Sequence, residues 1–250
     1  MQGVFHGMPD VLVNSWTLLV HTVHSILKSP PGKAMVVPHM FNIGNRSLLF
    51  LTVTLGFLGI ISVYQGCMQA MKVLPDLSMA GAVFIVVMIR EFGPTITALM
   101  LATRVGSGIA AEIGTMVVTE QIEALKVTNT DPVEYLVAPR FIAFIIMMVA
   151  CTAYGSLVAI ACGTVLAQVR FDLPPATFLS LELTDMSDFY QGLTKTIAYG
   201  VVIPIVSAES GFRAFGGSEG VGTATTRAVV NSLFAVIFLD FFIGAIARML

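Results

Sequence analysis

Long stretches without a charged residue alternate with short polar segments over most of this chain. Residues 141–167 form the clearest stretch, with no charged side chain at all. An α-helix rises about 1.5 Å per residue, so about 20 apolar residues cross a hydrocarbon core of about 30 Å. On this criterion we predict five transmembrane helices, at residues 47–71, 77–103, 141–167, 193–208 and 228–247.

Residues 10–28 show a different pattern, in which apolar side chains recur with the period of a helix. The apolar positions are Leu12, Trp16, Leu19, Val23 and either Ile26 or Leu27, and the polar positions opposite them are Asn14, His21, Ser25 and Lys28. Such an amphipathic helix lies in the membrane interface, with Trp16 at the headgroup level. We therefore predict an all-α membrane protein, with an N-terminal interfacial helix in residues 1–46 and five transmembrane helices in a domain of residues 47–250.

Three polar segments connect the predicted spans. Residues 104–140 are too polar to cross a bilayer. Residues 168–192 begin with Pro174-Pro175 and predict a short amphipathic helix, whose acidic edge is either solvated or a docking surface; its acids are Glu182, Asp185 and Asp188. Residues 216–227 are rich in glycine but lack the GK[ST] of a phosphate loop, so we predict a flexible turn and no nucleotide site.

Composition excludes several function classes. Hydrophobic residues make up 56% of the chain and charged residues only 11%, where soluble domains carry about 25% charged residues. The net charge of −2 argues against a nucleic-acid partner. The three cysteines follow no metal-binding spacing, and neither an HExxH nor a GxSxG motif is present. We therefore expect no metal site and no enzyme activity in this chain.

The distribution of basic residues predicts the orientation of the chain in the membrane. A cytoplasmic N-terminus places eight Lys and Arg residues on the inside and four on the outside. The inside set is Lys28, Lys33, Arg46, Arg104, Lys126, Arg140, Arg213 and Arg227, and the outside set is Lys72, Arg170, Lys195 and Arg248.

Arg90 and Glu91 lie near the middle of the second predicted span. One arginine at a helix centre costs roughly 2.5–3.5 kcal/mol, so such a residue normally faces protein or a hydrated cavity. Two interpretations stay open. In the first, side chains of neighbouring helices form ion pairs with Arg90 and Glu91, for instance Asp240 with Arg90. In the second, the two residues line a lipid-accepting cavity in which Arg90 meets a phosphate. The following Gly93-Pro94 is expected to kink the helix.

Small residues recur at four-residue intervals over the end of this span, namely Ala98, Ala102, Gly106, Ala110 and Gly114. In membranes such a ladder lets helix backbones approach closely. It predicts either a packing face within the chain or the seam of a dimer.

Residues 112–126 are expected to form one helix along the cytoplasmic face, which either docks on a soluble partner or is a solvated connector. Asp131 followed by Pro132 predicts the start of the next helix.

The ordered motifs of residues 40–248 resemble the MlaE/YrbE family of ABC transporter permeases. The matching segments are REFGP (90–94), TAL (97–99), RVGS (104–107), AEIGTM (111–116), TEQIEAL (119–125), EGVG (219–222) and ATTRAVV (224–230), with Asp240 in the last span. The resemblance implies a permease that moves phospholipid or a related lipid between the bacterial inner membrane and an outer envelope layer. It also implies a homodimer with two ATPase subunits, which bind ATP and Mg, an MCE-domain protein, and room for a small cytoplasmic accessory subunit.

The resemblance also assigns roles to residues. Arg90 and Glu91 would border the lipid cavity, and we add Met68, Met71 and Leu74 as an apolar wall for acyl chains. Residues 112–126 would be the helix that couples to the ATPase, with contacts from Glu112, Thr119, Glu120, Gln121, Glu123 and Leu125. An ion-coupled secondary transporter using Glu91 and Asp240 is the alternative function.

Overall fold

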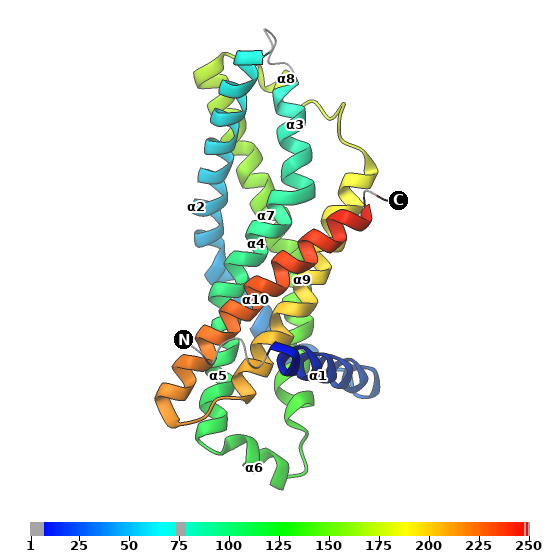
Figure 1. Ribbon diagram of the computed structural model, residues 1–250, viewed down its shortest axis with the longest axis vertical. Coiled ribbons are helices and arrows are strands. Elements are labelled where there is room, and N and C mark those ends of the chain that lie inside the picture. The colour runs from blue at the N-terminus through cyan, green and yellow to red at the C-terminus, as the bar shows by residue number, and fades with distance from the viewer. Residues whose placement is uncertain (1–7, 74–78, 248, 250) are drawn as a thin grey trace.

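The computed structural model describes residues 8–73, 79–247 and 249, and in these ranges it contains helices and no strand (Figure 1). The α-helices are α1 (Met8–Lys28), α2 (Lys33–Val73), α3 (Ala80–Val87), α4 (Gly93–Leu101), α5 (Ser107–Val118), α6 (Gln121–Val127), α7 (Ala138–Phe171), α8 (Pro175–Phe178), α9 (Met186–Phe212) and α10 (Gly217–Ala247). Three π-helical turns join some of them: η1 (Met88–Phe92), η2 (Ala102–Gly106) and η3 (Val133–Val137). The predicted all-α fold is confirmed.

Four helical segments of the described chain are long and apolar enough to cross a membrane: Lys33–Lys72, Ala80–Val118, Val133–Phe171 and Gly217–Ala247. The fifth predicted span corresponds to α9, which has 27 residues but carries several charged side chains. Most of these charges are buried against the neighbouring helices, and α9 packs on α5, α7 and α10. The protein is therefore a multi-pass membrane protein in which neighbouring helices shield the most polar of the long helices.

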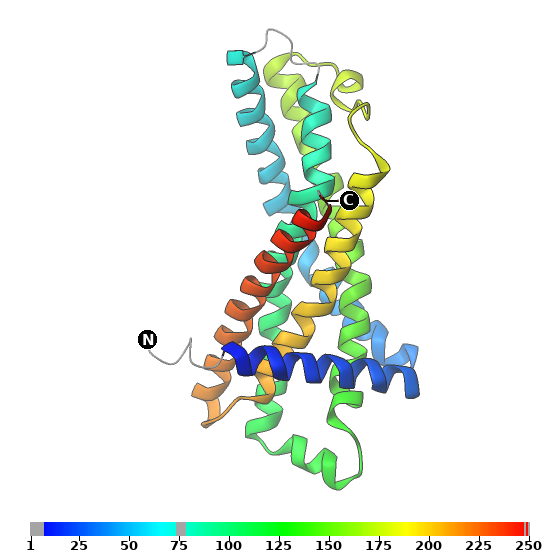
Figure 2. The same cartoon turned by 45° about the vertical axis from the view of Figure 1, so that its right-hand side comes forward.

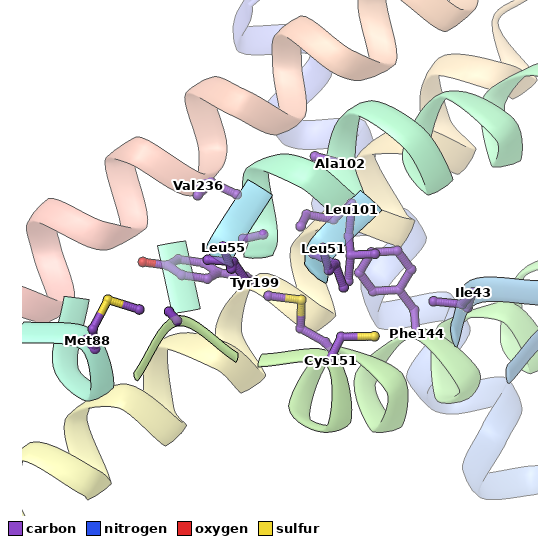
Figure 3. Close-up of a cluster of buried hydrophobic side chains, with 14 of the residues drawn as sticks. Ile43, Leu51, Leu55, Met88, Leu101, Ala102, Phe144, Cys151, Tyr199 and Val236 are labelled. Atoms are coloured by element: carbon purple, nitrogen blue, oxygen red, sulfur yellow. The ribbon is translucent and has the colours of Figure 1, made fainter. Parts of the chain in front are cut away.

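The helices form an elongated bundle with α2 and α7 side by side along much of its length (Figure 1). Close backbone approach makes this contact possible, because a Cβ atom on Gly59 of α2 would overlap the carbonyl of Ala159 on α7. Inside the bundle, side chains of α2, α4, α7 and α9 meet in one apolar core, which includes Leu51, Leu101, Phe144 and Tyr199 (Figure 3).

Helix α1 lies across the bundle, roughly at right angles to its long axis (Figure 2). On its inner face Thr22 and Ser25 are buried, and Leu18 and Ile26 pack against the apolar core. Its other face carries exposed apolar side chains, including Leu12, Trp16 and Leu27. This arrangement is that of a helix whose apolar face is left for the lipid of the membrane interface.

Several predicted boundaries differ from the observed ones. Helix α2 begins at Lys33, so the division at residues 46/47 falls inside a helix. The glycine-rich segment is not a flexible turn, because α10 begins at Gly217 and only Gly216 and Gly217 have the positive φ angles of a turn, 89° and 75°. The prediction of a solvated or docking acidic edge in residues 168–192 is also wrong in part. Asp185 and Asp188 form the capping box of α9, and Asp188 is buried.

The predicted single helix over residues 112–126 is wrong as well. The chain turns at Glu120, whose φ of 61° lies in the left-handed region, and this turn divides the segment into α5 and α6. After α6, the carboxylate of Asp131 accepts a hydrogen bond from the amide of Val133 at 2.9 Å, as expected for the start of the next helix.

Candidate substrate site within the membrane

A cluster of charged side chains lies where η1, α9 and α10 meet. At its centre is Lys195 of α9, which is fully buried. Its Nζ atom donates hydrogen bonds to Oε2 of Glu91 and, at 2.8 Å, to Oδ1 of Asp240. One ammonium group therefore links two carboxylates from two other helices.

Asp240 is held by three donors. Its Oδ1 atom also accepts hydrogen bonds from the hydroxyl of Tyr199 at 2.7 Å and from that of Thr95 at 3.1 Å. The phenol oxygen of Tyr199 points away from Leu51 and Phe144 of the apolar core (Figure 3). Charge-assisted hydrogen bonds of this kind offset the cost of removing a carboxylate from water.

Arg90 lies on the other side of Glu91 in the same cluster. Its Nε atom is 3.6 Å from Oε1 of Glu91, and its Nη1 atom is 3.4 Å from Oδ1 of Asp188. The sequence-based pairing of Arg90 with Asp240 is wrong, because Lys195 takes that carboxylate. Successive residues of an α-helix do not face each other, but Arg90 and Glu91 belong to a π-helical turn and do make contact.

Glycines allow the helices in and around the cluster to approach one another closely. A Cβ atom on Gly192 of α9 would overlap the carbonyl of Ile89 in η1, so only glycine permits this approach. Lys195 follows three residues later on α9 and thereby reaches Glu91. Gly93, directly before Pro94, is closely packed against Ser156. The helix accommodates Pro94 with a π-turn, a common cause of local distortion in a helix.

A cavity of about 220 Å³ opens beside these charges. It is lined by Glu91, Lys195, Asp240, Phe241, Gly244 and Ala245. Pockets for small molecules typically have about 300–1,000 Å³, so this cavity has room for a small polar group rather than for a whole large ligand. Its wall on α10 includes Phe241, which is 71% exposed.

The structure places the predicted substrate residues in two groups. Arg90 and Glu91 lie in the charged cluster, whereas Met68 and Met71 are exposed near the far end of α2 and do not line the cavity. Leu74 lies outside the described residues. Sequence reasoning missed Lys195, Tyr199, Thr95 and Asp188. The spacing of Gly192, Lys195 and Tyr199, which share one helix face, was the available signal.

The small-residue ladder is buried within this one chain. Ala98, Ala102 and Ala110 are fully buried, and a Cβ atom on Gly106 would press on Ser207 of α9. On Gly114 it would contact Ala214, just after α9. The ladder is therefore a packing face for α9 and the residues that follow it.

The predicted coupling residues lie at one end of the bundle, around α5 and α6 (Figure 1). Thr119, Glu120, Gln121 and Glu123 are exposed, while Leu125 is half-buried. Glu112 lies apart from them, because its Oε2 atom accepts a hydrogen bond from Nη2 of Arg140 at 2.9 Å.

The sequence of this chain is similar to those of known proteins over most of its length. The model of the family described as "Permease MlaE" matches residues 36–246. A probable ABC transporter permease protein of Synechocystis sp. is 35% identical over 235 residues, which cover 93% of this chain and 89% of that protein. Probable ABC transporter permease proteins of Rickettsia conorii and Pyropia yezoensis are 35% and 33% identical, covering 88% and 82% of this chain and 86% and 79% of theirs. The chain belongs to the MlaE permease family and is an ABC transporter permease subunit.

Proposed function

We propose that this permease moves a phospholipid or a related lipid between the bacterial inner membrane and the outer envelope, driven by a separate ATPase. The observation that carries this proposal is the buried Lys195, which bridges Glu91 and Asp240 beside a cavity. Ionisable groups inside a membrane are costly and usually mark a path for a polar substrate. A lipid phosphate can replace a carboxylate as the partner of Lys195 or Arg90.

Helix α10 supports the further proposal that the permease works as a homodimer. Only 11% of its most apolar 18-residue stretch is buried within the chain, and large apolar side chains project from the helix. The exposed ones are Phe234, Ile237, Phe238, Phe241, Phe242 and Ile246. A second copy packed on this face by twofold symmetry would enclose the cavity between two protomers, which gives a lipid a path shielded from the bilayer.

Helix α6 and the turn at Glu120 are the proposed contact with the ATPase. They protrude at one end of the bundle, and their acidic and polar side chains lack apolar neighbours that would bury them. With a cytoplasmic N-terminus, this end lies in the cytoplasm, where ATP is available. Two ATPase subunits would then bind one permease dimer, and an MCE-domain protein would receive or deliver lipid on the opposite side.

Reconstitution tests this function. The permease, purified from native membranes with its associated ATPase, is placed in liposomes that contain headgroup-labelled phospholipid, and transfer to acceptor vesicles is followed. We expect transfer that requires ATP hydrolysis and is lost in Lys195→Met. Unchanged transfer in that variant would contradict the role of the cluster.

The same preparation separates this function from ion-coupled transport. Glu91 and Asp240 share one ammonium group, an arrangement that also occurs in proton relays. Transfer driven by a proton gradient in the absence of the ATPase would favour a secondary transporter, whereas family membership favours ATP coupling.

A further inference from the structure

We propose that this permease has a second lipid site, outside the transport cavity, that binds the phosphate of an anionic phospholipid at the membrane boundary. The site is a cavity of about 160 Å³ between α2, the η2–α5 segment and α7. It shares no lining residue with the cavity beside Lys195. The polar side chains that line it are those of His39, Asn42, Arg46, Arg104, Glu112 and Arg140.

Two helix faces form the walls of this cavity. His39, Asn42 and Arg46 follow one another at three- and four-residue spacing along α2, and Arg104, Gly108 and Glu112 do so along η2 and α5. Each wall therefore presents one continuous stripe of side chains to the other.

The cavity is strongly basic. Three arginines and one glutamate line it, which leaves a net charge of +2 when His39 is neutral. Arg140 is 8% exposed and already paired, with Glu112 and with the carbonyl of Leu136. Arg104 has only an uncharged partner, the hydroxyl of Ser47 at 2.5 Å, and no carboxylate in the described part of the chain pairs with it or with Arg46. Two guanidinium groups facing one cavity therefore lack a counter-anion.

The three arginines lie at one level of the membrane. Arg46 directly precedes the uncharged stretch that starts at Ser47, and Arg140 directly precedes the one that starts at Phe141. Arg104 directly follows the apolar segment that ends at Thr103. Each is the charged residue at which its helix leaves the hydrocarbon core, which is the depth of the lipid phosphates.

Continuity with a lipid-exposed surface identifies the source of the phosphate. The stripe on α2 that carries Arg46 continues into the membrane with Leu49, Phe50 and Val53, at three-, four- and seven-residue spacing. These side chains are exposed on the surface of the chain. A phospholipid can thus place its phosphate between the arginines while its acyl chains lie along this strip. A soluble phosphate would contact only the arginines and not the apolar strip.

Gly108 offers a way to fill the cavity without removing a charge. It lines the cavity, and a Cβ atom built on it meets no atom within 4 Å. Gly108→Leu should therefore fold normally and occupy the space of the phosphate. Arg46→Gln combined with Arg104→Gln removes the charge instead. Arg170→Gln, at the exposed opposite end of α7, is the matched control.

Native mass spectrometry of the delipidated complex, titrated with phosphatidylglycerol, phosphatidylcholine or glycerol phosphate, tests the proposal. We expect phosphatidylglycerol to bind best, with about tenfold weaker binding in the double arginine variant and in Gly108→Leu, and no change in Arg170→Gln. This binding should persist in Lys195→Met, so its outcome is independent of the transport site. Equal binding by wild type and both cavity variants, loss of binding only in Lys195→Met, or equal affinity for glycerol phosphate would overturn the proposal.

Discussion

The Nζ atom of Lys195 on α9 lies 2.8 Å from the Oδ1 atom of Asp240 on α10. Tyr199 and Thr95 donate to the same oxygen, so one carboxylate connects α9, α10 and α4. A buried charge is costly unless it is paired and hydrogen-bonded. This contact therefore stabilises the packing of three helices and also places charged groups beside a cavity.

Lys195→Met should weaken both stability and transport. The substitution leaves the carboxylates of Glu91 and Asp240 without their shared cation, and loss of one partner from a buried ion pair costs about 3–5 kcal/mol. We expect the lower end of this range, because both carboxylates remain about one-third exposed. Thermal unfolding in nanodiscs measures the effect. Lys72→Met, at the exposed end of α2, is the control, and an equal unfolding temperature in the two variants would count against the buried pair.

Tyr199→Phe should have a smaller effect on the same carboxylate. It removes one hydrogen bond to a charged acceptor, which contributes about 1.5–3 kcal/mol, and changes no net charge. Tyr190→Phe on the same helix is the matched control, because Tyr190 is exposed. The free energies of chemical unfolding of the two variants should differ by about 1 kcal/mol or more. If both variants unfold like the wild type, the hydrogen bond to Asp240 contributes nothing measurable.

A pair of glycines on α2 tests the contact with α7. A methyl group on Gly59 would overlap the backbone of Ala159, whereas one on Gly66 meets nothing within 4 Å. Gly59→Ala should therefore destabilise the protein by about 1–3 kcal/mol, as overpacking does. Gly66→Ala should be neutral or slightly stabilising, since alanine favours helix more than glycine. Thermal unfolding of the two variants compares them directly, and the opposite order would mean that α2 and α7 do not pack in this way.

Reversal of charge at Glu120 and Glu123 should uncouple the permease from its ATPase. Both side chains are exposed around α6, so Glu120→Lys with Glu123→Lys should leave folding and membrane insertion intact. We expect stimulated ATP hydrolysis to be lost, because the two lysines make the surface around α6 basic, and this surface then no longer complements that of the ATPase. Glu182→Lys, in the exposed segment between α8 and α9, controls for a general effect of charge. Normal copurification and ATPase activity of the double variant would contradict a coupling role.

The sequence predicted the order of the long helices well, because four of the predicted spans fall in helices with an apolar stretch long enough to cross a membrane. It placed α9 less well, since the capping box of Asp185 and Asp188 starts that helix several residues before the apolar stretch. The glycine-rich start of α10 was also misjudged. Glycine lowers helix propensity, but the tight turn before α10 requires it here, since a Cβ atom on Gly220 would overlap the carbonyl of Phe215.

Three of the five charged residues of the cluster stood out in the sequence, and two did not. Arg90, Glu91 and Asp240 stand out because a charge inside an apolar stretch has no place in lipid. Lys195 follows an acidic segment near the predicted membrane boundary, so its sequence context suggested an exposed flank. The spacing of Gly192, Lys195 and Tyr199 indicates that they share one helix face, but it does not tell that η1 packs on this face, which only the structure shows.

An electron-density map of the permease with its ATPase in nanodiscs would show whether these membrane-embedded charges meet the polar part of a lipid. We expect two permease copies packed through α10, with headgroup density within hydrogen-bonding distance of Arg90 or Lys195. Acyl chains lying directly against residues 90 and 91, or a single permease copy without an ATPase, would contradict this expectation.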